Sequence, residues 1–315
     1  MKNVFSGLLP LVAALTLAAS AQAGERSGST YVPGTLGDFG IGLVATNPGL
    51  YARTDLFAYQ GTDAQSVRYG RVNLDLEMAA WVASLKLTAV PGWTFLGGRY
   101  AAGLNAGLVN AHVASDVRTQ APDGSTILTR QTGDRTALAD FYATPLALGW
   151  TLGDVHLAWI EMVTVPSGTY NGSEFVNVSR NYWALDSQLA ATWRHPVYGQ
   201  EVSCKTGYIL NDWNHDTDYR SGQEFHADGI LAQHLGRGLS LGAAWYFYHQ
   251  VTGDQGSGAM LGEFKGEAFG AGPILRTVIP VGSSYIALIG KWLHEFYTHG
   301  RFQGDYIFLW LATRL

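Results

Sequence analysis

Apolar and polar residues alternate with a period of two along most of the chain after residue 49. In the stretch that ends at Arg194, Trp183, Leu185 and Leu189 share one face, while Asp186 and Gln188 share the other. This period is that of a β-strand, and segments of about ten residues suit a tilted strand that crosses a bilayer. The pattern predicts twelve strands, at residues 50–59, 72–90, 100–113, 141–150, 155–165, 182–194, 201–213, 223–235, 239–251, 267–279, 284–297 and 305–315.

The connections between these strands alternate in length. Every second one is short, namely PGWT, LGD, HPVYG, GRG and PVGS. Most of the others are longer and polar, such as SDVRTQAPDGSTILTRQTGDRT and PSGTYNGSEFVNVSRN. Sorted connections of this kind are typical of an outer-membrane barrel, which has short periplasmic turns and longer extracellular loops. We therefore expect an all-β fold, a transmembrane antiparallel β-barrel of about twelve strands, rather than a soluble sandwich.

The last strand, GDYIFLWLATRL, stays apolar to the final residue. Chain ends of soluble domains are usually loose, whereas the last strand of a closed barrel must pair with the first. Ile307, Leu309, Leu311 and Leu315 lie on one face, as a lipid-facing stripe would. The segment resembles the signal that barrels present to their insertion machinery, although that signal usually ends in an aromatic residue.

Two stretches fit the strand pattern poorly. Residues 72–90 are too long for one span, and their alternation changes phase near Ala79 and Ala80. A β-bulge, an extension beyond the membrane or an amphipathic helix would each explain this. Pro145 lies within the strand predicted at 141–150, where it cannot donate a ladder hydrogen bond.

The N-terminus predicts export. A short charged region precedes an uncharged run from Phe5 to Ser20, and Ala21, Gln22 and Ala23 form a cleavage site. We therefore expect residues 1–23 to be a signal peptide cleaved after Ala23, since the apolar run is short for a membrane anchor. Residues 24–49, rich in glycine, either cap or enter the lumen or form a disordered leader, and residues 50–315 form the barrel.

Composition supports a lipid-facing chain more than a soluble one. Charged residues make up 14% of the sequence, against about 25% in ordinary soluble domains. The net charge is −5 and no run of Lys and Arg occurs, so nothing indicates a nucleic-acid partner. The single cysteine, Cys204, excludes an internal disulfide and falls on a lipid-facing set, where it acts as an apolar filler.

Charged and aromatic residues on the inward faces are the candidate lumen or selectivity residues. Buried charges of both signs must pair or stay hydrated, so they either brace the barrel or form a polar constriction that selects solutes. Inward aromatic rings either fill the lumen or line a path for aromatic solutes. The candidates are Asp186, Arg194, Lys205, Glu224, His226, Asp228, Tyr246, Tyr248, Lys291 and Glu295, with His234, Phe308 and Trp310 on the same faces.

Sites of other kinds have weaker support. The stretch NHDTDYRSGQEFHAD, which ends at Asp228, contains possible metal ligands, but their spacing matches no known loop, and an extracellular loop explains it better. Ser257 lies among glycines, but Gln255 takes the first Gly position of a G-x-S-x-G motif and no histidine shares the loop. We therefore expect no enzymatic activity and no cofactor.

Several stretches resemble a bacterial family of transporters labelled "meta-pathway of phenol degradation". They include TPLALGWTLGDVHLA, VPSGTY, RNYWALDSQLAATW, TDYRSGQEFHAD, HQVTGDQGSGA and AFGAGPILR, from about residue 140 to the C-terminus. Before that point the match is limited to LGDFGIGL and NPGLY. The resemblance implies an outer-membrane barrel that helps hydrophobic aromatic compounds enter, without catalytic residues.

The sequence thus predicts a channel in the outer membrane of a Gram-negative cell. Its partners would be a small solute, which the resemblance implies is aromatic, together with outer-membrane lipid and the barrel-insertion machinery. Two other functions remain open, a membrane-embedded lipid hydrolase and a structural or adhesive barrel. A serine and a histidine that meet at the outer rim would favour the hydrolase, and large, varied loops would favour the adhesive barrel.

Overall fold

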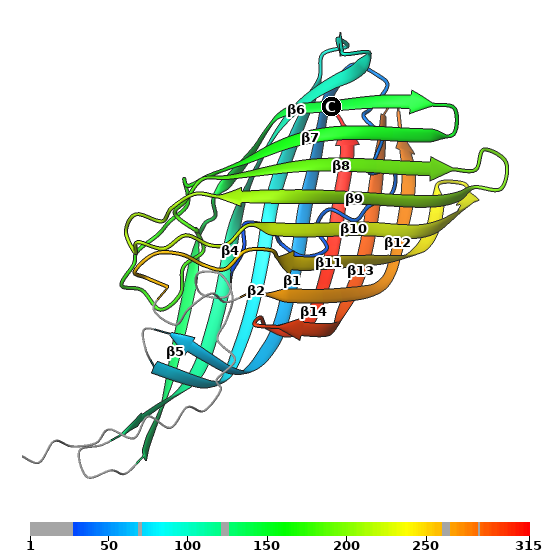
Figure 1. Ribbon diagram of the computed structural model, residues 1–315. Helices are drawn as coiled ribbons and strands as arrows, with labels where there is room; N and C mark the ends of the chain where they lie inside the picture. Colours follow the sequence, from blue (N-terminus) through cyan, green and yellow to red (C-terminus); the bar gives the residue numbers. More distant parts are fainter. Residues whose placement is uncertain (1–27, 69–70, 121–125, 260–264, 283) are drawn as a thin grey trace, which may run out of the picture.

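The chain forms a closed antiparallel β-barrel (Figure 1). This computed structural model describes residues 28–68, 71–120, 126–259, 265–282 and 284–315. The strands are β1 (Gly49–Arg68), β2 (Arg71–Val90), β3 (Thr94–Phe95), β4 (Gly98–Gln120), β5 (Thr126–Leu138), β6 (Phe141–Leu152), β7 (Val155–Val165), β8 (Ala184–Arg194), β9 (Gln200–Asn211), β10 (Glu224–Gly236), β11 (Leu239–Gln250), β12 (Glu267–Val281), β13 (Ser284–His299) and β14 (Gln303–Arg314).

The predicted strand number is confirmed. β5 and β6 both pair with β4 and follow one another along it, so they count as one strand of the wall. β3 is a two-residue strand within the turn before β4. The barrel therefore has twelve strands, and among the described residues no helix is long and apolar enough to span a membrane.

The last strand closes the barrel against the first, as its apolar end predicts. β14 pairs with β1 from Tyr51, opposite Arg314, to Thr62, opposite Gln303. The Leu315 N–H donates to the Leu50 carbonyl at 2.9 Å, so the pairing runs to the last residue. Because the barrel closes, the backbone N–H and C=O groups have hydrogen-bond partners where β1 and β14 pair, as a hydrocarbon environment requires.

Side chains alternate between the outer surface and the interior along each strand. In β13, Trp292 and Phe296 are exposed on the outside, while Lys291 and Glu295 are buried inside. In β14, Leu309 is exposed and its neighbour Trp310 is buried. The apolar face therefore points outward, as a transmembrane barrel requires and a soluble sandwich does not.

The first strands are longer than predicted. β1 and β2 continue to Arg68 and Arg71, and β4 continues to Gln120, through residues predicted to be loop. The loop prediction for residues 126–138 was wrong, because they form β5. In β1, β2, β4 and β5 the extra chain length forms strands that extend past the rest of the barrel (Figure 1). By contrast, residues 166–183 and 212–223 are long connections that follow β7 and β9, and residues 251–259 follow β11.

The two irregular stretches are strands with local shifts in pairing. β2 keeps one phase across Ala79 and Ala80, with Ala80 buried and Trp81 exposed, so the predicted phase change there was wrong. Its register with β4 shifts instead between Leu74 and Glu77. In β6 the register with β7 shifts between Ala143 and Leu146, which brackets Pro145. A bulge accommodates the missing N–H of proline.

Candidate functional site

Residues 28–48 cross the interior of the barrel (blue in Figure 1). Tyr31 and Phe39 are buried there among side chains of distant strands. We call residues 28–48 the inner segment. The signal peptide predicted at residues 1–23 lies outside the described residues.

A turn shapes the middle of the inner segment. The Thr35 N–H donates to the Val32 carbonyl at 3.2 Å, and Gly34 has a φ of 77°. Proline before a glycine of positive φ is the sequence of a type II turn, which explains the order Val32, Pro33, Gly34, Thr35. A Cβ on Gly34 would also lie 2.3 Å from a Leu293 methyl carbon, so glycine is needed for space as well.

Inward side chains of β10 and β13 hold this turn. The Tyr31 hydroxyl donates to Asp228 at 2.7 Å, and the Gly37 N–H donates to the other oxygen of Asp228 at 3.1 Å. The Lys291 ammonium donates to the Gly37 carbonyl at 2.8 Å and to the Gly34 carbonyl. A segment without secondary structure must find partners for its buried backbone groups, and these side chains supply them.

Further contacts extend this anchorage along β8 and β10. The Tyr31 ring stacks on His226, with ring centroids 4.3 Å apart, and His226 lies 3.0 Å from Asp186. The Ser29 hydroxyl donates to Glu224. Burial, and then the charge of Asp228, raise the pKa of Tyr31 well above its ordinary value, so its hydroxyl remains a donor at physiological pH.

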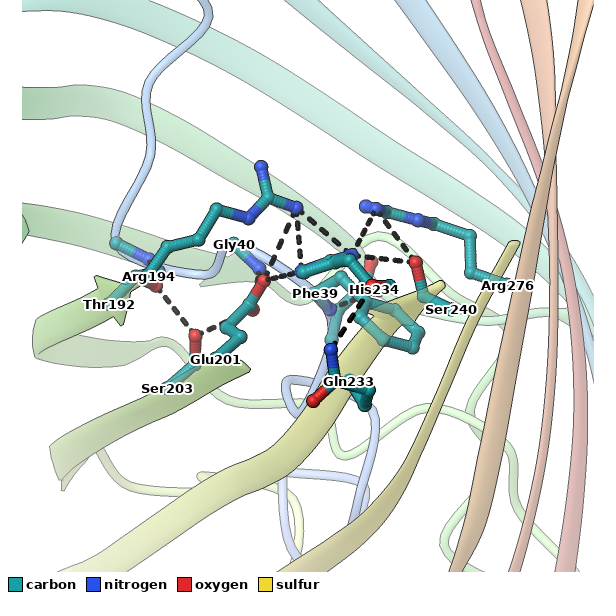
Figure 2. Close-up of polar contacts among 12 residues, drawn as sticks. Phe39, Gly40, Thr192, Arg194, Glu201, Ser203, Gln233, His234, Ser240 and Arg276 are labelled. Carbon is teal, nitrogen blue, oxygen red and sulfur yellow. Dashed lines mark hydrogen bonds and ion pairs between the residues drawn. The ribbon is translucent and has the colours of Figure 1, made fainter. Parts of the chain in front are cut away.

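A second group of side chains holds the inner segment at the end of the barrel where β1 begins. We call Arg194, Glu201, His234, Ser240 and Arg276 the rim cluster. They come from five consecutive strands, β8 to β12. Figure 2 shows these side chains around the backbone of Gly40 and the ring of Phe39.

The rim cluster binds the inner segment through the carboxylate of Glu201 and the guanidinium of Arg276. Glu201 accepts from the Gly40 N–H at 2.6 Å and lies 2.7 Å from His234 Nε2 (Figure 2). The Arg276 guanidinium lies over the Phe39 ring, 4.6 Å from its centroid. Because each interaction involves either a charged group or a desolvated ring, the cluster fixes where the inner segment leaves the barrel.

The rim cluster also brings a serine and a histidine together. His234 Nδ1 lies 2.7 Å from the Ser240 hydroxyl, and Glu201 lies at the opposite ring nitrogen. A nucleophile must be reachable by its substrate. Here Ser240 is 1% exposed and its oxygen also accepts from Arg276 at 3.2 Å, so the geometry serves anchorage rather than attack on a lipid. The pair lies inside the barrel and not at the outer rim.

The other stretches examined for chemistry are part of loops. Ser257 donates to Asp218 at 2.6 Å, and no histidine contact of Ser257 is found among the described residues. Within the same part of the chain, no three side chains of His, Cys, Asp or Glu are grouped so that they could hold a metal ion. Cys204 faces outward in β9 and is partly exposed, as its predicted position requires.

The inner segment leaves one side of the interior open. A cavity of 270 Å³ lies between residues 28–36 and the inward faces of β1, β2, β4 and β6. We call these inward faces the cavity wall, and those of β8 to β13 the docking wall. The cavity wall is mainly apolar where it meets the cavity, through Phe57, Met78, Ala80, Val82, Val109 and Ala111.

The predicted lumen residues divide unequally between these regions. All lie on inward faces, and Arg194 is the most exposed of them, with 40% of its side chain accessible. Glu295 reaches the cavity, and so do Trp310 and Tyr59, whose hydroxyl donates to Glu295 at 3.0 Å. The others belong to the docking wall and its surroundings: Asp186, Arg194, Lys205, Glu224, His226, Asp228, Tyr246, Tyr248 and Lys291. A role in solute selection stays a prediction for each.

The cavity wall contains polar residues that the sequence reasoning missed. Arg53, Lys86, Asn105 and Tyr142 all line the cavity. Alternation could have found them, because Arg53 shares its face with Asp55 and Tyr59, and Lys86 interrupts the apolar inward set of β2.

Comparisons with known proteins agree with this architecture. A family model described as "Putative MetA-pathway of phenol degradation" matches residues 58–311. The outer membrane channel COG4313 from Pseudomonas putida F1 superposes with a TM-score of 0.65 at 16% identity, over 90% of this chain and 98% of that one. At this identity the likeness shows the fold alone.

Other solved barrels are more distant. The transport unit of the Escherichia coli autotransporter AIDA-I has a TM-score of 0.41 at 11% identity, over 89% of this chain and 93% of that one. The translocator domain of Neisseria meningitidis NalP has a TM-score of 0.42 at 12% identity, over 85% and 89%. No curated protein matches the sequence.

Proposed function

The chain belongs to this phenol-degradation family, and on that premise we propose that it is an outer-membrane channel for passive uptake of small apolar, chiefly aromatic, compounds. The observation that carries the proposal is the apolar cavity between the inner segment and the cavity wall. A family labelled by the degradation of phenol, and a structural relative described as an outer membrane channel, support the same function.

The size and lining of the cavity suit an aromatic solute. Its 270 Å³ exceed the roughly 150 Å³ that hold a benzene ring in an engineered protein core. Aromatic rings prefer offset or edge-to-face contact with other rings. The rings that line the cavity are those of Tyr31, Phe57, Tyr59, Tyr142, Phe302, Tyr306 and Trp310.

The mechanism needs no cofactor. A solute leaves water for the apolar cavity, moves along the cavity wall and is drawn inward by its own concentration gradient. The inner segment stays bound to the docking wall and narrows the lumen, so large polar solutes are excluded. Export by cleavage after Ala23, and recognition of the apolar last strand by the barrel-insertion machinery, belong to the same proposal.

Filling the cavity tests the proposal. Ala80 is buried and lines the cavity, whereas Ala83 lies three residues along β2 and faces outward. We expect Ala80→Trp to reduce uptake of radiolabelled naphthalene by cells that produce the protein, because an indole ring occupies the path. Ala83→Trp is the matched control and should leave uptake unchanged.

The two variants must be compared at equal amounts of folded barrel in the outer membrane. Equal naphthalene uptake by both variants and the native protein would contradict a path along the cavity wall. Uptake by the native protein no greater than by cells without it would contradict the function itself.

A further inference from the structure

One row of the cavity wall carries an unused positive charge. Arg53, Lys86, Asn105 and Tyr142 lie directly opposite one another on neighbouring strands β1, β2, β4 and β6. Paired strands are about 4.8 Å apart, so these four side chains enter the cavity at one level.

Two members of this row already have partners. Arg53 Nε lies 2.6 Å from Asp55 Oδ1, and its guanidinium lies 4.4 Å from the centre of the Trp310 ring. The Tyr142 hydroxyl donates to the Thr30 carbonyl at 3.0 Å. Neither group is therefore free to receive a ligand without losing a contact.

The other two members of the row, Lys86 and Asn105, have no such partner in the part of the chain that the structure describes. Among the described residues, no carboxylate lies within ion-pair distance of the Lys86 ammonium, and no hydrogen bond from it is found. The buried carbonyl oxygen of the Asn105 side chain likewise has no hydrogen-bond partner. Lys86 is partly buried, and a charge withdrawn from water without a partner is costly, so the row is incomplete as it stands.

The carboxylates around the cavity cannot complete the row, because each is already bound. Asp55 is paired with Arg53. Asp140 accepts from the Ser179 hydroxyl at 2.6 Å and from two backbone N–H groups. Glu295 accepts from the Tyr246 hydroxyl at 2.5 Å and from the Gly304 N–H of β14 at 2.7 Å.

The next inward positions along these strands change character. Ser84 lies two residues from Lys86 along β2. The next inward residue, Val82, lies opposite Phe57 on β1 and Val109 on β4. Farther still, Ala80 lies between Tyr59 and Ala111. A ligand in the cavity would thus meet the paired Arg53 and the unpaired Lys86 at one level, and a mainly apolar, ring-lined surface over the following levels of β1, β2 and β4.

We propose that Lys86 binds the carboxylate of an aromatic acid whose ring lies against Phe57, Val82 and Val109. The Asn105 carbonyl oxygen accepts from a hydroxyl on the ring carbon next to the carboxylate. This inference rests on the proposed uptake function and adds to it a substrate class, the aromatic and hydroxyaromatic carboxylates, that a purely apolar path would not favour.

Calorimetric titration of the purified full-length mature protein in detergent tests the site, with benzoate and benzyl alcohol as probes. Both carry one ring, but only benzoate carries a charge. The native protein should bind benzoate more tightly than benzyl alcohol, and 2-hydroxybenzoate more tightly than benzoate. Equal affinity for benzoate and benzyl alcohol would overturn the proposal without any variant.

Lys86→Met should lower benzoate affinity roughly tenfold, because a charge-assisted hydrogen bond is lost. Benzyl alcohol binding should change little, and Lys86→Arg should retain most of the benzoate affinity. Lys205→Met is the matched control, since Lys205 is also an inward lysine but does not line the cavity. An equal loss of benzoate affinity in Lys86→Met and Lys205→Met would mean that benzoate responds only to the overall positive charge of the lumen, and it would overturn the site.

Asn105→Ala tests the second contact. It should remove the advantage of 2-hydroxybenzoate over benzoate and leave benzoate affinity nearly unchanged. An advantage that persists in Asn105→Ala would overturn the role of Asn105. Naphthalene uptake separates the two proposals: a protein that transports naphthalene but does not prefer benzoate keeps the channel function and loses only the carboxylate site.

Discussion

The docking wall and the cavity wall follow the same inside–outside alternation but differ in what they turn inward. The docking wall presents Asp228, Lys291 and Glu201, each bound to the backbone of the inner segment. The cavity wall presents apolar side chains such as Val82 and Val109 to the cavity. An irregular segment needs hydrogen-bond partners, so it lies against the wall that offers them and leaves the apolar wall uncovered.

In the proposed function, this difference lets one barrel be both occupied and passable. The docking wall holds the inner segment by charge-assisted contacts, while on the other side Arg53 pairs with Asp38, Tyr142 donates to Thr30, and the rest of this side borders the cavity. The proposal thus gives the docking wall the role of holding the inner segment and the cavity wall the role of selecting what passes.

The strongest test of the docking wall is Asp228→Ala. It removes the acceptor of both Tyr31 and Gly37 and takes one buried charge from a group that includes His226, 3.8 Å away. Loss of one partner of a buried charged pair costs about 3–5 kcal/mol. Hydrogen exchange measured by mass spectrometry should show that residues 28–42 lose protection while the strands keep theirs.

The control for Asp228→Ala is Ser84→Ala on the cavity wall, which should leave the exchange of residues 28–42 as it is in the native protein. Native protection of these residues in Asp228→Ala would mean that the docking wall does not hold the inner segment.

A charged residue placed on the outer surface tests the alternation of outward apolar and inward side chains that both walls share. Leu288 lies on the outward face of β13, three residues from inward-facing Lys291. Leu288→Arg should impair insertion by about 2–4 kcal/mol if the residue lies near mid-membrane. Folding titrations in lipid vesicles measure this, with Leu288→Phe as the apolar control. Normal insertion of Leu288→Arg would place this face away from lipid.

A pair of tyrosines compares the two walls more finely. Tyr31→Phe removes a hydrogen bond to the Asp228 carboxylate and should cost about 1.5–3 kcal/mol of docking, whereas Tyr142→Phe removes one to a neutral carbonyl and should cost about 0.5–1.5 kcal/mol. Exchange of the amides of residues 28–42 reports both values. A larger effect of Tyr142→Phe would reverse the roles assigned to the walls.

The barrel could be predicted from the sequence because lipid enforces alternation. Strands such as β8 and β13 must keep one face apolar, so Leu185, Leu189 and Trp292 mark them clearly. β5 lacks this mark: TILTRQTGDRTAL is polar on both faces, and most of its side chains are exposed. Without an apolar face, a strand and a loop look alike in the sequence.

The inner segment and the cavity could be predicted only in part. Residues 24–49 have no periodicity, and their partners lie more than a hundred residues away, as with Ser29 and Glu224. The inward position of Glu224, His226 and Lys291 followed from alternation, but what they bind did not. Alternation could have placed Lys86 inward, but its lack of a partner can be recognised only when the neighbouring strands are placed beside it.

The central claim is that solutes pass along the cavity wall and not along the docking wall. A crystal structure of the protein soaked with iodobenzene would test this most directly, because the anomalous signal of iodine locates the ring without ambiguity. The account predicts an iodine peak between the inner segment and the side chains of Phe57 and Val82. A peak between the inner segment and Asp228 or Lys291, with none at the cavity wall, would contradict it.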